Sequence, residues 1–181
     1  MMNGPVIETR LAEAYRAAME RGRIVVFSAP CGFGKSVVSH ALVQGCRVRE
    51  LSADEGDFTL PADDGTWDVL RLDQLQNLPE EEQDGLCQLL RTAVERRFVL
   101  LSRGALPGWL APFQFSGLLQ VFTADDLALH REGAAELLAQ YGVTLSDTEL
   151  TAALQDTSGH PLALDMLGRC MAARREGYTP A

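Results

Sequence analysis

Residues 29–36 read Ala29-Pro-Cys-Gly-Phe-Gly-Lys-Ser36, and this stretch decides the fold. Its two glycines permit a tight turn in which backbone N–H groups point inward at phosphate oxygens. A lysine in this position reaches the outer phosphates of a nucleotide, and the hydroxyl that follows it binds Mg²⁺. Lys35 is the only lysine in a chain whose other basic residues are all arginine. The stretch therefore predicts a phosphate-binding loop, although Ala29 stands where the pattern has glycine.

The flanking sequence fits this interpretation, because such a loop lies between a strand and a helix. Residues 24–28, Ile-Val-Val-Phe-Ser, form a β-branched apolar run typical of a buried strand. Residues 37–43 place Val37, Val38, Ala41 and Leu42 on one side of a predicted helix, whose N-terminal end favours an anion. The alternative is a glycine-rich turn with a solvated lysine.

Composition narrows the class of protein. The chain has 181 residues, is 46% hydrophobic and carries a formal net charge of −9. A core large enough for one domain and a small appendage is possible, whereas this charge disfavours non-specific binding to nucleic acids. We find no apolar run of membrane-spanning length and no signal peptide. The four cysteines show no metal-ligand spacing, so we expect a reduced, cytoplasmic protein.

Strand patterns alternate with helix patterns in the first two thirds of the chain. This alternation predicts an α/β fold, with a parallel five-stranded sheet flanked by helices. We expect strands at residues 24–28, 47–51, 67–73, 98–101 and 118–122, and helices at 8–21, 37–43 and 79–97, the last of them closed by Arg96 and Arg97. Ligands of such sheets bind at the carboxyl ends of the strands. Ser28, Asp73 and the pair Ser102-Arg103 lie at such ends.

Asp73 ends the strand that follows the loop helix, where nucleotide enzymes of this class place a second contact to Mg²⁺. Arg71 interrupts the apolar run and weakens the match. Asp73 is also compatible with an ordinary turn or helix-capping residue, and Arg103 with a surface ion pair.

Strand patterns stop after residue 123. Residues 124–141 predict one long helix, Ser146-Asp-Thr-Glu149 is a capping box that opens a second, and Gly159-His-Pro161 opens a third. We therefore expect a nucleotide-binding α/β domain at residues 1–123 and a small helical subdomain at residues 124–181.

The order of these motifs resembles the signal-transduction ATPases with numerous domains, the STAND class, and most closely the maltose-regulator type found in LuxR-type transcriptional activators. Ala29 to Ser36 resembles their phosphate loop, Leu100-Leu-Ser-Arg103 their sensor strand, and Gly159-His-Pro-Leu-Ala-Leu164 their glycine-x-proline motif. Residues 125–127 through 137–138 resemble the segment between the last two. The resemblance covers about residues 20 to 173.

The resemblance implies a P-loop NTPase fold, and a regulatory switch that binds ATP or ADP with Mg²⁺. Lys35 would contact the β- and γ-phosphates, Ser36 and Asp73 would hold Mg²⁺, and Arg103 would sense the γ-phosphate. His160 and Pro161 would lie against the base. The implied nucleotide-binding set is Ala29, Pro30, Cys31, Gly32, Phe33, Gly34, Lys35, Ser36, Val37, His160 and Pro161. Implied partners are downstream domains of the same regulator, or further copies of the chain in the ATP state.

Two departures bear on function. Relatives carry a second acid after the strand-end aspartate, and this chain has Gln74, which predicts weak or no hydrolysis. The stretch between Lys35 and Asp73 is short, so a helical layer usual in the family is expected to be missing. An active ATPase or small-molecule kinase of the same class, and an interaction module that binds no nucleotide, are the competing functions.

Overall fold

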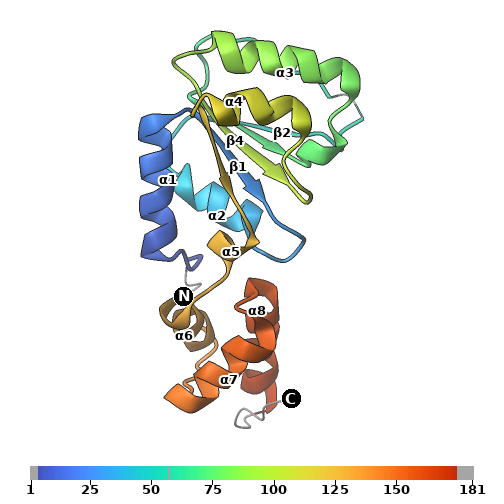
Figure 1. The fold of residues 1–181 in the computed structure, drawn as a ribbon. Helices are drawn as coiled ribbons and strands as arrows, with labels where there is room; N and C mark the ends of the chain where they lie inside the picture. Colours follow the sequence, from blue (N-terminus) through green and yellow to red (C-terminus); the bar gives the residue numbers. More distant parts are fainter. Residues whose placement is uncertain (1–3, 57, 175–181) are drawn as a thin grey trace.

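A sheet of five parallel strands forms the centre of the larger part of the molecule (Figure 1). The computed structural model describes residues 4–56 and 58–174. The strand order is β2-β3-β4-β1-β5, which places the strand before the loop next to the end of the sheet. The strands are β1 Ile24–Ser28, β2 Val48–Ser52, β3 Val69–Asp73, β4 Arg97–Ser102 and β5 Leu119–Phe122. The predicted α/β fold with a five-stranded parallel sheet is confirmed.

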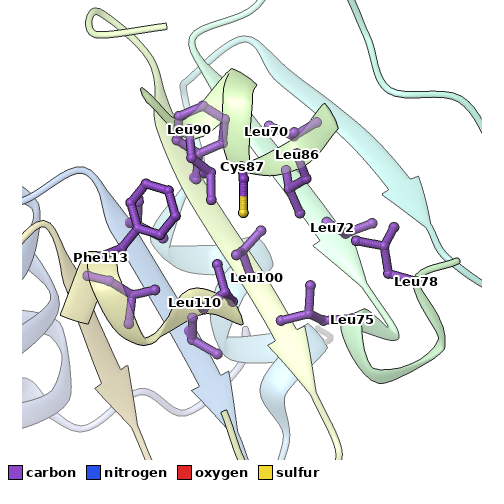
Figure 2. Close-up of a cluster of buried hydrophobic side chains, with 14 of the residues drawn as sticks. Leu70, Leu72, Leu75, Leu78, Leu86, Cys87, Leu90, Leu100, Leu110 and Phe113 are labelled. Atoms are coloured by element: carbon purple, nitrogen blue, oxygen red, sulfur yellow. The ribbon is translucent and has the colours of Figure 1, made fainter. Parts of the chain in front are cut away.

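Helices cover both faces of this sheet (Figure 1). On one face, Leu11 and Tyr15 of α1 (Thr9–Arg21) and Val38 of α2 (Lys35–Leu42) pack against alternate residues of β1, β3 and β4. On the other, α3 (Glu80–Thr92), the short turn η2 (Gly108–Leu110) and α4 (Ala111–Phe115) cover the remaining residues. Figure 2 shows Leu86, Cys87 and Leu90 above the sheet with Phe113 beside them. A strand covered on both faces must be apolar throughout, and Ile24 to Phe27 are accordingly buried.

Four helices follow the last strand within the described residues, and most of them form a separate layer beyond the carboxyl ends of the strands (Figure 1). They are α5 Ala124–Leu127, α6 Arg131–Ala139, α7 Asp147–Thr157 and α8 Pro161–Arg174. Ala134, Leu138, Leu150 and Leu164 form the centre of a small core of their own. The predicted capping box is present, because Ser146 Oγ accepts from the Glu149 N–H and the Glu149 carboxylate accepts from Ser146.

The prediction of a single helix over residues 124–141 is wrong, because the chain leaves the helical conformation at Ala128, where φ is −62° and ψ is 136°. Backbone groups in this break bind partners that are distant in the sequence. Arg10 donates to the carbonyl oxygen of Ala128 at 2.7 Å, and the N–H of Leu129 donates to the carbonyl of Gly159 at 2.8 Å. These tertiary hydrogen bonds replace the helical ones.

The helix expected over residues 79–97 also ends early, at Thr92. Arg23 donates from both terminal nitrogens to the last carbonyls of α3, at 2.7 Å from Ala93 and 3.0 Å from Leu90. Arg97 instead begins β4, and its N–H donates to Asp68 in the neighbouring segment. Arg96 and Arg97, which were expected to close this helix, therefore lie beyond its end.

No helix lies between β2 and β3 in the described parts of this connection, residues 53–56 and 58–68. Among the described helices, none combines the length and apolar character needed to cross a bilayer.

Candidate phosphate-binding site

The loop predicted to bind phosphate joins the end of β1 to the start of α2. Gly32 and Gly34 have φ values of 88° and 72°, a region that side chains disfavour, so both turns of the loop require glycine. Gly34 is the N-cap of α2, and Lys35 is its first helical residue. The free N–H groups of the first turn of α2 therefore lie directly after the loop, where they favour an anion.

Lys35 is folded back into this loop. Only 8% of the residue is exposed, and Nζ donates to the carbonyl oxygens of Ala29 at 2.5 Å and Pro30 at 2.8 Å. Burial is the main cause that lowers the pKa of Lys35; the thiol of Cys31 raises it, the charge of Arg103 lowers it and the carboxylate of Asp73 raises it. The ammonium group is thus held inside the loop, close to the other charged residues of the predicted site.

Ser36 and Asp73, the two residues predicted to hold Mg²⁺, lie in contact. Ser36 Oγ donates to Asp73 Oδ2 at 3.1 Å, and the other carboxylate oxygen accepts the N–H of Gln74 at 2.7 Å. A hydroxyl and a carboxylate are oxygen ligands of the kind that Mg²⁺ prefers. Among the described residues no three His, Cys, Asp or Glu side chains gather as a metal site. This donor set fits a Mg²⁺ ion that takes its remaining ligands from phosphate and water.

Arg103 follows the last residue of β4 and lines the same cavity as Lys35 and Asp73. β1 and β4 are neighbours in register, with Ser28 opposite Ser102, so the end of β4 opens beside the loop. The backbone N–H of Arg103 donates to Gln76 Oε1 at 3.0 Å, which leaves its exposed guanidinium available to a ligand.

Two glutamines connect these strand ends: Gln74, which the sequence marks as a departure from the resembled family, and Gln76, which the sequence does not mark. Gln74 has φ 57° and ψ 39°, an uncommon conformation for a residue other than glycine. Gln76, in the short turn η1 (Leu75–Asn77), donates to Gln74 Oε1 at 2.7 Å and accepts from Arg103. Left-handed backbone conformations such as that of Gln74 are enriched at functional sites. No sequence signal marks Gln76, because its partner Arg103 follows the next strand of the sheet.

His160 and its neighbours bring the start of α8 against the loop. The ring centroid of His160 lies 4.5 Å from that of Phe33 in an edge-to-face arrangement, and Nε2 is 3.3 Å from the carbonyl oxygen of Cys31. The N–H of Leu162 donates to the carbonyl of Gly32 at 3.1 Å. A methyl group at Gly32 would come within 2.4 Å of the imidazole, so this close approach also requires glycine.

A cavity of about 1050 Å³ opens over these residues. Its polar lining includes Lys35, Ser36, Asp73 and Arg103, the rest of the loop from Cys31 to Val37, and the acidic residues Glu8, Glu50, Asp126 and Asp165. Its apolar lining includes residues of the N-terminal segment and of the C-terminal helices and their connections: Val6, Ile7, Leu129, Leu137, Pro161 and Leu162. Ala29, Pro30 and His160 do not line it; the first two contribute the carbonyls that hold Lys35, and His160 supports the loop from behind.

No protein-family model matches this sequence, and no curated protein matches it. Solved structures do resemble its fold. The RuvB Holliday junction branch migration motor of Thermotoga maritima superposes with a TM-score of 0.59 at 15% identity, over 97% of this chain and 67% of that one. Two variants of RuvB give TM-scores of 0.57 and 0.59 at 16% and 14% identity, over 95% and 93% of this chain.

The chain spans 62% of the length of each of those two RuvB variants. At 14–16% sequence identity, these likenesses show only that the backbones are arranged in the same way. The sheet order, the glycine loop between β1 and α2 and these likenesses agree: the chain has the fold of a P-loop NTPase.

Proposed function

We propose that this chain binds ATP and ADP with Mg²⁺ and acts as a regulatory nucleotide switch. The observation that carries the proposal is the contact between Ser36 Oγ and Asp73 Oδ2 at 3.1 Å, directly after a glycine loop and at the edge of a large cavity. A glycine-rich turn that binds no phosphate does not require a strand-end carboxylate next to the hydroxyl of Ser36.

The proposed roles follow from position. The N–H groups of the loop and of the first turn of α2 bind the phosphates, and Lys35 exchanges its carbonyl partners for phosphate oxygens. Ser36 and Asp73 hold Mg²⁺, which neutralises phosphate charge when bound. Arg103 contacts the terminal phosphate. Pro161, with the other apolar residues of the cavity wall, receives the base, and His160 reports on the state of the loop.

Hydrolysis is proposed to be weak or absent. Attack on the γ-phosphate needs a group that orients and deprotonates water. Gln74 carries a neutral amide at the position next to Asp73, and its oxygen already accepts a hydrogen bond from Gln76. A neutral side-chain amide is not basic enough to accept a proton from water at neutral pH.

The resemblance to STAND proteins supports a place for this segment in a cytoplasmic LuxR-type transcriptional regulator. Downstream domains of such a regulator, or further copies of the chain in the ATP state, are the proposed partners. The net charge of −9 supports a chain that acts through other domains rather than on nucleic acid directly.

The alternative is a working ATPase. The likeness in fold to RuvB, which is described as a branch migration motor, favours it. Turnover separates the two functions: enzymes of ordinary efficiency reach about 1 per second or more. Steady-state ATP hydrolysis at that rate by this chain would establish the alternative and end the proposal of weak hydrolysis.

Calorimetry with ATP and ADP, with and without Mg²⁺, tests the proposal. We expect measurable binding by the parent protein and a loss of about 100-fold or more in Lys35→Ala, because several charge-assisted hydrogen bonds to phosphate are removed. Arg49→Ala is the matched control: it removes a cation from β2 that is exposed and does not line the cavity. Equal affinity of Lys35→Ala and the parent would place the nucleotide elsewhere, and no binding by the parent would favour an interaction module.

A further inference from the structure

Arg71 is a buried cation in the middle of an apolar strand. Only 7% of the residue is exposed, and its neighbours in β3 belong to the hydrophobic core. Leu70 and Leu72 face α3, while Val69 packs on the opposite face, with α1 and α2. Side chains alternate along a strand, so Arg71 and Asp73 share the face of Val69. The strand thus directs a guanidinium towards α2, beside the carboxylate proposed to hold Mg²⁺.

The contacts of this guanidinium are few and specific. Nε donates to Ser39 Oγ of α2 at 2.9 Å. One terminal nitrogen lies 3.7 Å from Glu50 Oε2 on the edge strand β2, and the other lies 3.8 Å from Asp73 Oδ2. Both carboxylates are too distant for a hydrogen bond. Arg71 therefore acts on Asp73 mainly through its charge, and its burial limits screening by salt.

Hydrogen bonds connect Arg71 to the proposed metal ligands by a second route. Ser39 Oγ, which binds Arg71, also donates to the carbonyl of Ser36 at 3.1 Å. The side chain of Ser36 donates to the same Oδ2 atom of Asp73 that faces the guanidinium. A ring of four residues thus links β3 to α2.

We propose that Arg71 is a positioning residue that serves as a built-in counter-cation of Asp73 and sets how strongly the site binds Mg²⁺. The inference depends on the proposed nucleotide function. Two effects compete when Arg71 is removed. Asp73 loses support, which weakens metal binding, and it loses a nearby positive charge that repels the ion, which strengthens it. The charge effect dominates, because the separation of 3.8 Å is too long to fix the carboxylate, which Ser36 and the N–H of Gln74 already hold.

The consequence is a site that does not bind Mg²⁺ without nucleotide. It binds Mg²⁺ together with the phosphates of a nucleotide, because their negative charge outweighs the positive charge of the guanidinium.

We would measure ADP binding by calorimetry over a series of Mg²⁺ concentrations. Arg71→Met and Arg71→Gln remove the charge, and the glutamine keeps an N–H donor for Ser39. In both variants, the Mg²⁺ concentration that produces half of the maximal gain in ADP affinity should fall by about tenfold or more. This is the size of effect that one neighbouring charge exerts on a carboxylate. Arg71→Lys keeps the charge and should stay within about threefold of the parent.

An unchanged or raised Mg²⁺ requirement in the folded neutral variants would overturn the proposal, and so would a lysine variant that behaves as they do. ADP affinity in excess chelator serves as the internal reference, because Arg71 does not line the cavity. A general packing defect would lower this affinity, whereas a counter-cation changes the Mg²⁺ dependence.

A second measurement needs no nucleotide. Asp73→Asn should lower the melting temperature of the parent, because it removes a negative charge 3.8 Å from a buried guanidinium. In Arg71→Met the same substitution should raise the melting temperature or leave it unchanged, because Asp73 then has no guanidinium whose attraction the substitution could remove. Equal effects in the two backgrounds would show no coupling and would overturn the pairing. If the two backgrounds respond differently but the parent protein binds no ADP, the proposed nucleotide function and the Mg²⁺ role of Arg71 are overturned. The electrostatic pairing of Arg71 with Asp73 would then still stand.

Discussion

Gln74 combines two features at one residue: a left-handed backbone conformation, and a neutral side chain where the STAND proteins that the sequence resembles carry an acid. Its backbone N–H binds Asp73 Oδ1, so the conformation keeps the carboxylate in place, and its side chain binds Gln76. The geometry required to place a group beside Asp73 is therefore present, and what is missing is the charge.

Gln74→Glu should raise ATP hydrolysis by about 10- to 100-fold, because a carboxylate of the same length can accept a proton from water. The hydrogen bond from Gln76 survives, since the new side chain also accepts. Phosphate release under saturating ATP and Mg²⁺ measures the effect. Gln155→Glu adds the same charge at an exposed position of α7 and should leave hydrolysis unchanged. A flat response at Gln74 would remove this explanation for weak catalysis.

At the level of elements, Tyr15 connects α1 to the sheet. It is 7% exposed and stacks on Phe27 of β1 with ring centroids 6.5 Å apart. Burial is the main cause that raises the pKa of Tyr15 to about 12, from its usual value of 10. The folded state therefore holds the phenol proton more tightly than the unfolded chain does, and stability is fully present below pH 10.

Stability should then fall as the pH rises from 10 to 12, by about 2 to 3 kcal/mol, because the unfolded chain ionises first. Tyr15→Phe keeps the packing and has no proton to lose, so its unfolding free energy should change less over this interval. Urea denaturation across the range, monitored by circular dichroism, gives the comparison. Parallel curves for the two proteins would assign the alkaline loss to other groups.

Gly159 controls how α8 begins. Its φ is 67°, its carbonyl accepts from Leu129, and an added methyl group would lie 2.5 Å from the Leu129 carbonyl oxygen. Gly159→Ala should destabilise the chain by about 1 to 3 kcal/mol, since it combines backbone strain with a clash against backbone atoms. Gly108→Ala meets no atom within 4 Å and should have a small effect. Equal midpoints of urea unfolding for both variants would contradict this account.

At the scale of the whole molecule, the N-terminal segment and the loop both hold the helical subdomain in place. Gln140 donates to the carbonyl of Gly4 at 3.1 Å, and Arg10 reaches Ala128. Leu162 donates to Gly32. A ligand in the cavity would touch the loop, the first residues and α8 at once, so we expect it to stabilise these parts together.

Hydrogen exchange measures this coupling. ADP with Mg²⁺ should slow amide exchange in residues 29–36 and in residues 161–165, because both flank the cavity, and leave α7 little changed. Lys35→Ala should show neither effect at the same ADP concentration. Protection confined to the loop would mean that the helical subdomain does not respond to nucleotide.

The sequence by itself determined the parts of this protein that depend on local spacing. Glycines at 32 and 34, the apolar run before them and the amphipathic pattern after them predict the strand, loop and helix, because turn geometry and burial periodicity are properties of neighbouring residues. The position of Asp73 at a strand end and the capping box at Ser146 follow in the same way.

Only the tertiary structure decided which backbone and charged groups pair across the fold. The hydrogen bonds from Arg10 to Ala128, from Arg23 to Ala93, from Arg103 to Gln76 and from Arg71 to Ser39 each join residues at least 27 positions apart. Hydrogen bonds and charges over such separations depend on how strands and helices pack, and periodicity in the sequence carries no record of them.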